Sequence, residues 1–177
     1  MRPDIRVAAD VLLTPVCMEH APAYAALVDE ERARLVRWLA WAEASRTVDD
    51  VRGFLADVER RRAGDLGENY AILVDGVLAG SLDVHDVDHQ HAVGALGYWL
   101  GARFGGRGVM ARAVRALSER AFADHRLHRL EILAATQNVA SRHVAERAGF
   151  ALEAVLRERL RAPAGFDDCA LYVRFAP

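Results

Sequence analysis

The stretch RFGGRG, residues 103–108, separates an apolar segment from a run with helical periodicity. Six of the thirteen glycines in the chain fall between Gly94 and Gly108. Without side chains, consecutive backbone N–H groups can converge in such a loop, and a helix that begins after Gly108 adds the positive end of its dipole. The stretch therefore predicts a cradle for a pyrophosphate, with Arg103 and Arg107 adding charge nearby. The alternative is a glycine-rich turn that needs only positive φ angles.

Two other phosphate-binding motifs compete with this interpretation. A P-loop needs GxxxxGK followed by Ser or Thr, and the sequence contains no such run. Residues 106–111 do fit GxGxxA, and Glu131 follows at roughly the spacing of a dinucleotide-binding unit. That fingerprint normally opens a doubly wound domain, whereas here it follows a hairpin and has one βαβ unit around it. An NAD-dependent oxidoreductase is therefore the lesser alternative.

Hydrophobic periodicity predicts the elements around this loop. A strand is expected at 92–101 before it, and a helix after it with an apolar face of Met110, Val114, Leu117 and Ala121. The C-terminal part then predicts a strand, a helix that Gly149 stops, and two further strands, at 130–135, 138–148, 150–160 and 168–175.

The N-terminal half predicts a strand at 11–16, a helix at 20–30 and a second helix that Thr47 caps. Asp75-Gly76, between apolar runs at 70–74 and 77–85, is typical of a two-residue hairpin turn. The resulting order is strand, two helices, three strands, helix, strand, helix, two strands. It predicts an α/β fold with a mixed sheet and helices on both faces, and we expect residues 1–177 to form a single domain.

The composition excludes several classes of partner. The 23 basic and 25 acidic residues give a net charge of −2, so no overall field attracts nucleic acid or an anionic membrane. No apolar run approaches the roughly 20 residues that span a bilayer. The N-terminus lacks the apolar stretch of a secretory signal, and Cys17 and Cys169 form no CxxC motif, so we expect a cytoplasmic protein.

Several separate motifs together resemble the GNAT superfamily of N-acetyltransferases, in its RimJ/RimL-type branch. They are the R-x-x-G-x-G loop, GYWL at 97–100, N-x-x-S-x-x-V-A-E-R-x-G-F at 138–150, and W-L-x-W at 38–41. Glu153, Leu156, Arg157, Glu158, Asp168 and Tyr172 extend the pattern. The resemblance covers nearly the whole chain.

The resemblance implies a GNAT fold, a mostly antiparallel sheet with splayed central strands, and transfer of an acetyl or other short acyl group from acetyl-CoA to an amine. The amine would belong to a small molecule or to a protein N-terminus, and a homodimer is left open. Cofactor contacts are implied for the backbone of Tyr98, Trp99 and Leu100, for Asn138 and Ser141, and for the loop residues Arg103, Phe104, Gly105, Gly106, Arg107, Gly108, Val109 and Met110. Ser141 would lie near the sulfur and donate to the leaving thiolate.

The general base is less clear, because Ala95 stands where many relatives carry Glu. Glu158 is the only charge among apolar residues on one expected face of the strand 150–160, which predicts a base with a perturbed pKa. A bulge or an arginine partner would instead make it a surface residue. Asp83 and His85 are secondary candidates, expected on a solvated strand face. Without the Ala95 carboxylate, a non-catalytic acyl-CoA sensor also stays open.

A metal site and a covalent intermediate receive little support. His85, His89 and His91 lie near Asp86 and Asp88, but this loop spacing lacks helical His-x-x-x-His geometry, so we expect no metal. Neither cysteine falls in the expected acyl site, so we expect direct attack of the amine rather than an acyl-enzyme.

Overall fold

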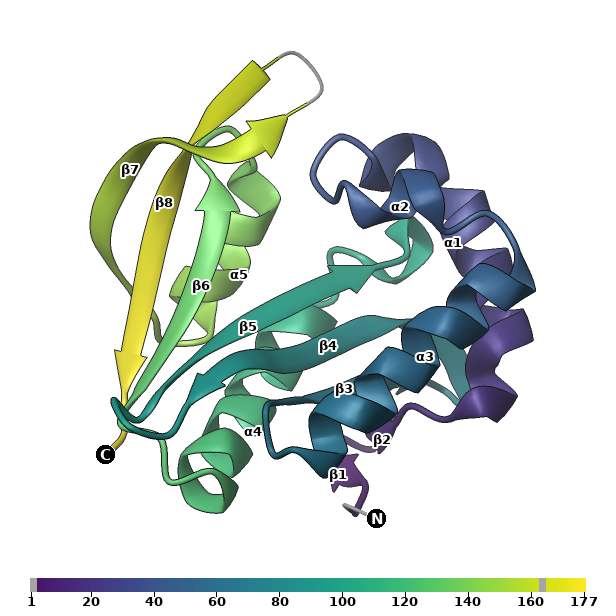
Figure 1. The fold of residues 1–177 in the computed structure, drawn as a ribbon, viewed down its shortest axis with the longest axis horizontal. Helices are drawn as coiled ribbons and strands as arrows, with labels where there is room; N and C mark the ends of the chain where they lie inside the picture. Colours follow the sequence, from purple (N-terminus) through teal and green to yellow (C-terminus); the bar gives the residue numbers. More distant parts are fainter. Residues whose placement is uncertain (1–2, 163–164) are drawn as a thin grey trace.

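A single eight-stranded sheet organises the chain in the computed structural model, which describes residues 3–162 and 165–177 (Figure 1). The strands lie in the order β1-β2-β3-β4-β5-β6-β8-β7. Their bounds are β1 Ile5–Arg6, β2 Val11–Pro15, β3 Glu68–Val74, β4 Val77–Asp88, β5 Val93–Leu100, β6 Arg129–Ala135, β7 Ala151–Ala162 and β8 Gly165–Phe175. All neighbouring pairs are antiparallel except β5 and β6.

Helices cover both faces of this sheet, which confirms the expected fold class (Figure 1). They are α1 Ala21–Leu35, α2 Trp41–Ala44, α3 Val48–Ala63, α4 Val109–Asp124 and α5 Val139–Arg147, with short 3₁₀ turns η1 Met18–His20 and η2 Ala102–Phe104. Helix α1 runs five residues beyond its expected end. No helix within residues 3–162 and 165–177 is long and apolar enough to cross a membrane.

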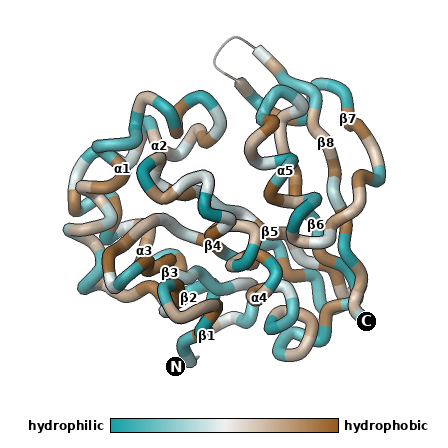
Figure 2. The backbone as a smooth tube through the Cα atoms, turned by 180° about the vertical axis from the view of Figure 1, so that it is seen from behind, coloured by the Kyte–Doolittle hydropathy of each residue, from teal (hydrophilic) through white to brown (hydrophobic). Residues whose placement is uncertain are grey.

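Two hydrophobic cores lie on opposite faces of the sheet. Leu96 of β5 packs with α4 and α5 on one face, and Trp99 packs with α1 and α3 on the other. Strand residues alternate between faces, so odd and even positions of β5 belong to different cores. Figure 2 shows hydrophobic and hydrophilic residues interleaved along the strands and helices.

Local signals in the sequence set the element boundaries. Thr47 Oγ1 accepts a hydrogen bond from Asp50 N at 3.1 Å, and Asp50 Oδ2 accepts from Thr47 N at 2.8 Å, which forms a capping box at the start of α3. Asp75 and Gly76 adopt φ angles of 49° and 77°, as the predicted hairpin turn requires. Gly149, with φ 91°, follows α5 as expected.

The sheet splits at β5 and β6, the one parallel pair among the described strands. Strands β5 and β6 pair over three residues, from Val93 with Arg129 to Ala95 with Glu131. Beyond Ala95, β5 stays with β4 as far as Leu100, while β6 stays with β8 as far as Ala135. The two strands diverge into a V-shaped opening, visible in Figure 1 between the labels β5 and β6. This splay was expected, and it creates the candidate site.

Candidate active site

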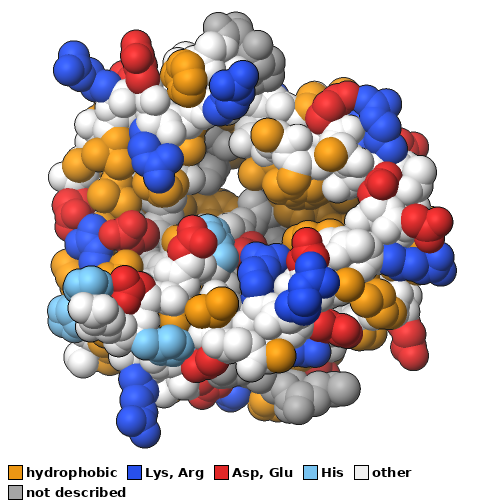
Figure 3. All heavy atoms as spheres, in the orientation of Figure 1, with side chains coloured by type: hydrophobic (Ala, Val, Ile, Leu, Met, Phe, Trp, Pro, Cys, Tyr) orange, Lys and Arg blue, Asp and Glu red, His pale blue; other side chains and the backbone are white. Residues whose placement is uncertain are grey.

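A cavity of about 920 Å³ occupies the opening between β5 and β6. Its walls come from the end of α1, the outer half of β5, the glycine loop, the first turn of α4, the end of β6 and the start of α5. Figure 3 shows the hollow at the centre of the molecule, with hydrophobic side chains around it. Residues that are far apart in the sequence therefore meet in one site.

The glycine loop forms one end of this cavity. Gly106 and Gly108 have φ angles of 74° and 70°, and no described atom lies within 4 Å of where a Cβ would stand on either residue. Gly108 is the N-cap of α4, and the first turn of α4 carries no acidic side chain. Free N–H groups at a helix start, next to an open backbone, suit an anionic group.

The two loop arginines do not line the cavity. The Arg107 guanidinium lies 3.3 Å from Asp10 Oδ2, and Arg103 lies 3.8 Å from Glu30 and over the Phe104 ring at 4.9 Å. Phe104, Gly105, Gly106, Gly108, Val109 and Met110 do line it. The predicted anion contact of this loop therefore depends on its backbone.

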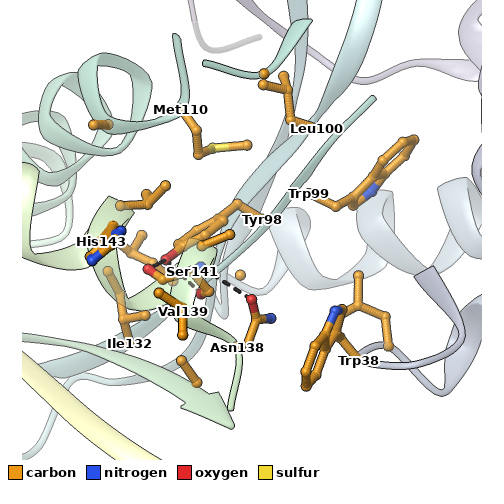
Figure 4. A pocket seen from close by; sticks show the side chains of 18 of the residues that line it. Trp38, Tyr98, Trp99, Leu100, Met110, Ile132, Asn138, Val139, Ser141 and His143 are labelled. Carbon is orange, nitrogen blue, oxygen red and sulfur yellow. Dashed lines mark hydrogen bonds between the residues drawn. The ribbon is translucent and has the colours of Figure 1, made fainter. Parts of the chain in front are cut away.

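Tyr98 joins β5 to the start of α5 by hydrogen bonds. Its hydroxyl lies 3.0 Å from both the carbonyl oxygen and the Oγ of Ser141, and Asn138 Oδ1 accepts from Ser141 N at 3.2 Å (Figure 4). Burial raises the pKa of Tyr98 to about 12, although the hydrogen bond with Ser141 acts to lower this pKa. The phenol therefore stays protonated and can donate to the Ser141 carbonyl, which leaves the Ser141 hydroxyl as donor to the phenol oxygen.

The next residue of β5 faces the other way, into an aromatic wall. The Trp99 ring lies 5.4 Å from Tyr24 and 6.0 Å from Trp41. Figure 4 shows Trp38 on the same side of the cavity as Trp99, while Tyr98 reaches toward Ser141 and His143. Arg34 at the end of α1 donates to the Leu100 carbonyl. The cavity thus has a polar wall at α5 and an aromatic wall formed by Trp38, between α1 and α2, and Trp99 of β5.

The expectation that Glu158 lies alone on an apolar face is wrong. The pairing of β7 with β8 shifts register between Leu152 and Ala154 and again between Leu156 and Leu160. Glu158 lies in the second shift with φ 51°, its N–H donates to Asp168 Oδ1 at 2.9 Å, and its side chain is exposed. Leu160, not Glu158, lines the cavity. The bulge, weighed above as the alternative, removes Glu158 from the site.

Asp83 and His85 were expected to be solvated, and this is also wrong. Both side chains are partly buried, with 20% and 32% exposed, and His85 Nδ1 lies 2.8 Å from Asp83 Oδ2. His85 lines the cavity beside Ala95 and Gly97. The signal in the sequence was present, because small residues on one strand make room for larger side chains on its neighbour.

The remaining histidines and cysteines do not gather. His89 and His91 contact Asp65 and Asp88, respectively, and no cluster that could hold a metal ion occurs in the part of the chain that the structure describes. Cys17 lies beside His20 outside the cavity, and Cys169 is buried. Nothing in this arrangement supports a cysteine acyl-enzyme.

The dinucleotide-binding alternative does not fit the sheet. A doubly wound domain needs several parallel strands, whereas β5 and β6 form the one parallel pair among the described strands. Glu131 lies within β6 and accepts a hydrogen bond from Arg129 Nε at 2.6 Å, rather than facing the glycine loop.

Comparisons with known proteins agree with this geometry. Residues 10–151 match the acetyltransferase (GNAT) domain family. The chain is 34% identical over 153 residues to a candidate ribosomal N-acetyltransferase, YdaF of Bacillus subtilis (strain 168). This alignment covers 86% of this chain and 84% of that protein.

Solved structures show the same fold. A RimL ribosomal L7/L12 α-N-protein acetyltransferase in complex with coenzyme A superimposes with a TM-score of 0.94, at 24% identity and 98% coverage of each chain. The microcin C7 self-immunity acetyltransferase MccE, in complex with acetyl-CoA and AMP, gives a TM-score of 0.92 at 22% identity, covering 96% of this chain and 94% of that chain.

Proposed function

Because this chain belongs to the GNAT acetyltransferase family and is an acetyl-CoA-dependent N-acetyltransferase, we propose that its acceptor is the N-terminal amine of a protein. The observation that carries the proposal is the opening between β5 and β6, which joins the glycine loop and the start of α4 at one end to Trp38 and Trp99 on the opposite face. We also propose that residues 1–177 act as one domain, since the sheet continues without interruption past the matched residues.

The cofactor would lie along the free edge of β5. Gly101 N donates to Ala79 O at 2.7 Å, so Gly101 points its backbone groups toward β4. Because neighbouring residues alternate, Tyr98 and Leu100 turn theirs toward the opening. Within the described residues β5 has no strand partner on this edge beyond Ala95, which leaves amides available to the pantetheine arm and to a developing oxyanion.

The glycine loop would hold the pyrophosphate at the α4 N-terminus. Asn138 and Ser141 stand at the start of α5, where the thioester end of the cofactor would come close to β5. In this arrangement Ser141 Oγ, already a donor to Tyr98, can turn to donate its proton to the leaving thiolate.

The aromatic side of the cavity suits a polypeptide end. Trp38, Leu39 and Leu160 line it, and it opens between the α1–α2 segment and the β7–β8 hairpin, which face each other across the gap in Figure 1. An N-terminal amine also has a pKa of about 7.7–8.0, against about 10.4 for a lysine side chain, so a larger fraction is neutral and nucleophilic at pH 7. Two relatives are named for acetylation of ribosomal proteins.

A mass-spectrometric acceptor screen tests this proposal. The enzyme and acetyl-CoA would be incubated with peptides that carry a free N-terminus, with the same peptides blocked at the N-terminus but containing lysine, and with small amines. We expect one acetyl group on the free N-terminal amine and none on the blocked peptides. Acetylation confined to lysine or to small amines would contradict the proposed acceptor.

A sensor that binds acyl-CoA without turnover was the alternative that the sequence left open, because Ala95 cannot supply a carboxylate. Release of free coenzyme A thiol in the same pooled reactions separates the two. An enzyme releases thiol in proportion to the acetylated amine, whereas a sensor binds acetyl-CoA and releases none.

A further inference from the structure

The cavity holds few groups that could accept a proton at neutral pH. Its ionisable lining residues among those the structure describes are Arg34, His85, Tyr98, His143 and Arg147, with no Asp, Glu or Cys. Arginine stays charged and Tyr98 stays protonated, so the two histidines are the only bases in this lining. They lie on opposite sides of the sheet.

His85 lies on the face where the amine is proposed to enter. It pairs across the sheet with Ala95, just as Asp83 pairs with Gly97 and Ser81 with Trp99. Trp99 belongs to the core under α1 and α3, so these paired residues share that face. His143 is on α5 beside Ser141, on the side proposed for the thioester (Figure 4).

The sheet leaves space for the His85 and Asp83 side chains. A Cβ on Gly97 would stand 2.8 Å from Asp83 Oδ1 and 3.2 Å from His85 Cε1. Real Cβ atoms essentially never approach another heavy atom closer than 3.0 Å, so any side chain at this position would push the carboxylate away. Gly97 and Ala95 are therefore the residues that let the pair lie flat on β5.

Asp83 fixes the orientation and tautomer of the ring. A carboxylate only accepts hydrogen bonds, so Nδ1, at 2.8 Å from Asp83 Oδ2, carries a proton and Nε2 holds the lone pair of the neutral ring. We propose that His85 is the general base that deprotonates the acceptor amine, with Asp83 as its positioning residue. This inference rests on the proposed function, because it needs an amine in the cavity.

Charged and titratable groups on several neighbouring elements surround His85. Asp86 Oδ2 lies 3.9 Å from Nε2 but is 88% exposed, and Arg61 on α3 acts in the opposite sense. Tyr24 on α1 is kept protonated by burial, which raises its pKa to about 12, and Glu131 on β6 is bonded to Arg129. Burial alone would lower the pKa of His85, yet the hydrogen bond and charge of Asp83 outweigh it, and the pKa of His85 is raised.

His85 takes up and then releases the proton that the reaction produces. The ammonium group loses one proton to His85 Nε2, and its freed lone pair forms the C–N bond to the thioester carbonyl carbon. The tetrahedral intermediate loses a second N–H proton to solvent and the C–S bond breaks. The thiolate takes up a proton from Ser141 Oγ, the proposed donor, and Ser141 regains one proton from solvent, so these two exchanges with solvent cancel. Products are the amide, coenzyme A thiol and one proton released to solvent when His85 resets.

Three variants and a pH profile test the role of His85. We expect His85→Gln to lower kcat by about 10²-fold or more and to remove the acidic limb of kcat/KM that the histidine causes, with unchanged acetyl-CoA affinity. Asp83→Asn should move that limb to lower pH, because the pKa of His85 falls when the carboxylate charge is lost. His143→Gln, which removes the other histidine of the lining, should keep the limb in place. The same acceptor amine is used with every variant, so the ionisation of the amine contributes equally to each pH profile.

NMR titration of the His85 ring gives a second readout that does not need turnover. In the wild type its Cε1–H signal, assigned by its loss in His85→Gln, should report a pKa above that in Asp83→Asn. The proposal is overturned if His85→Gln leaves both kcat and the acidic limb unaltered. It is also overturned if Asp83→Asn leaves the pKa of the His85 ring unchanged. Turnover of small amines but not of peptides contradicts only the proposed acceptor, since the same pH profile can then be measured with a small amine.

Discussion

Ser141 occupies a position where a single hydroxyl can matter for chemistry but not for folding. Its Oγ contacts the Tyr98 hydroxyl at 3.0 Å, while its backbone is already fixed by the Asn138 cap. We expect Ser141→Ala to lower kcat by about 10-fold or more with little change in acetyl-CoA affinity, because a proton donor typically contributes about 10²–10⁴-fold. Steady-state kinetics with calorimetric cofactor binding measures both quantities.

Ser45→Ala is the matched control for this change. The Ser45 hydroxyl donates to the Trp41 carbonyl at 3.2 Å on an exposed helix end, outside the cavity. It should leave kcat unaltered. Equal kcat in Ser141→Ala and wild type would remove Ser141 from the mechanism.

Substitution of Gly106, with Gly76 as a control, separates a loss of cofactor binding from the effect of backbone strain. Gly106→Ala and Gly76→Ala both place a Cβ at a left-handed φ, 74° and 77°, with no described atom within 4 Å. Each should lose about 1–2 kcal/mol of stability. Only Gly106→Ala should weaken coenzyme A binding, and each 1.4 kcal/mol of lost binding free energy raises the dissociation constant about tenfold. Gly76→Ala should leave binding unchanged, because Gly76 lies in the β3–β4 turn. Equal dissociation constants by calorimetry would contradict the assignment of the loop.

For single residues, the sequence predicted candidate residues better than it predicted which way their side chains point. Glu158 was assigned to an apolar face by alternation, but alternation holds only while the register is unbroken, and a shift of one residue reverses every side chain. His85 was assigned, together with Asp83, to a solvated strand face. Its burial depends on α1 and α3, whose position over β4 the periodicity of β4 does not contain.

Helix α3 depends on its first turn, where Thr47 was correctly predicted as the cap and the structure adds Asp50 as the second half of a capping box. Thr47→Ala removes one side of the box and should destabilise the fold by about 0.5–2 kcal/mol. For a chain of this size we expect Tm to fall by about 2–4 °C per kcal/mol, measured by calorimetry. Thr47→Ser, which keeps the hydroxyl, should restore most of the loss. A Tm drop shared equally by both variants would mean that the methyl group, not the cap, is responsible.

The same capping box predicts how this effect changes with pH. Hydrogen bonds from Thr47 and Arg46 lower the pKa of Asp50, so its contribution to stability is complete above the unfolded-state pKa and is lost as the pH falls through the folded-state pKa. The difference in Tm between wild type and Thr47→Ala should therefore shrink in acid.

Long periodic elements were predicted well, and short ones were not. The face of α4 formed by Met110, Val114, Leu117 and Ala121 is buried throughout. In contrast, β1 and α2 have two and four residues, too few to show a period, and they form because they pack on β2 and α1. Periodicity needs about two turns or several alternations before it is informative.

The whole molecule should respond to a ligand that fills the split in the sheet. A ligand that binds only the folded state stabilises it by RT ln(1 + [L]/Kd), about 2.7 kcal/mol at a hundredfold excess over Kd. Acetyl-CoA should therefore raise Tm by about 5–11 °C, and free coenzyme A should approach this value.

NAD and ATP are the controls for this thermal shift. They share a diphosphate with coenzyme A but lack the pantetheine arm that would follow the free edge of β5. At equal concentration they should shift Tm much less. A larger shift with NAD than with acetyl-CoA would contradict the proposed mode of binding.

At the scale of the molecule, patterning predicted a mixed sheet with helices on both faces, whereas the splay of the central strands was predicted only through a resemblance. Periodicity predicts where strands are, but the divergence beyond Ala95 depends on which strands pair, and pairing joins residues such as Ala95 and Glu131 that are distant in sequence. The aromatic wall has the same origin, since Tyr24, Trp41 and Trp99 come from three elements.

The three-residue parallel junction of β5 and β6 has a consequence for handedness. Two parallel neighbouring strands joined by a helix almost always form a right-handed crossover, a preference that comes from the chirality of L-amino acids. The path from β5 to β6 through α4 therefore has one favoured face of the sheet to cross, and α4 must begin near the point where β5 ends. A mirror-image crossover would exchange the cofactor and acceptor faces. Chirality at each Cα thus selects the face of the sheet from which we propose that the acceptor approaches.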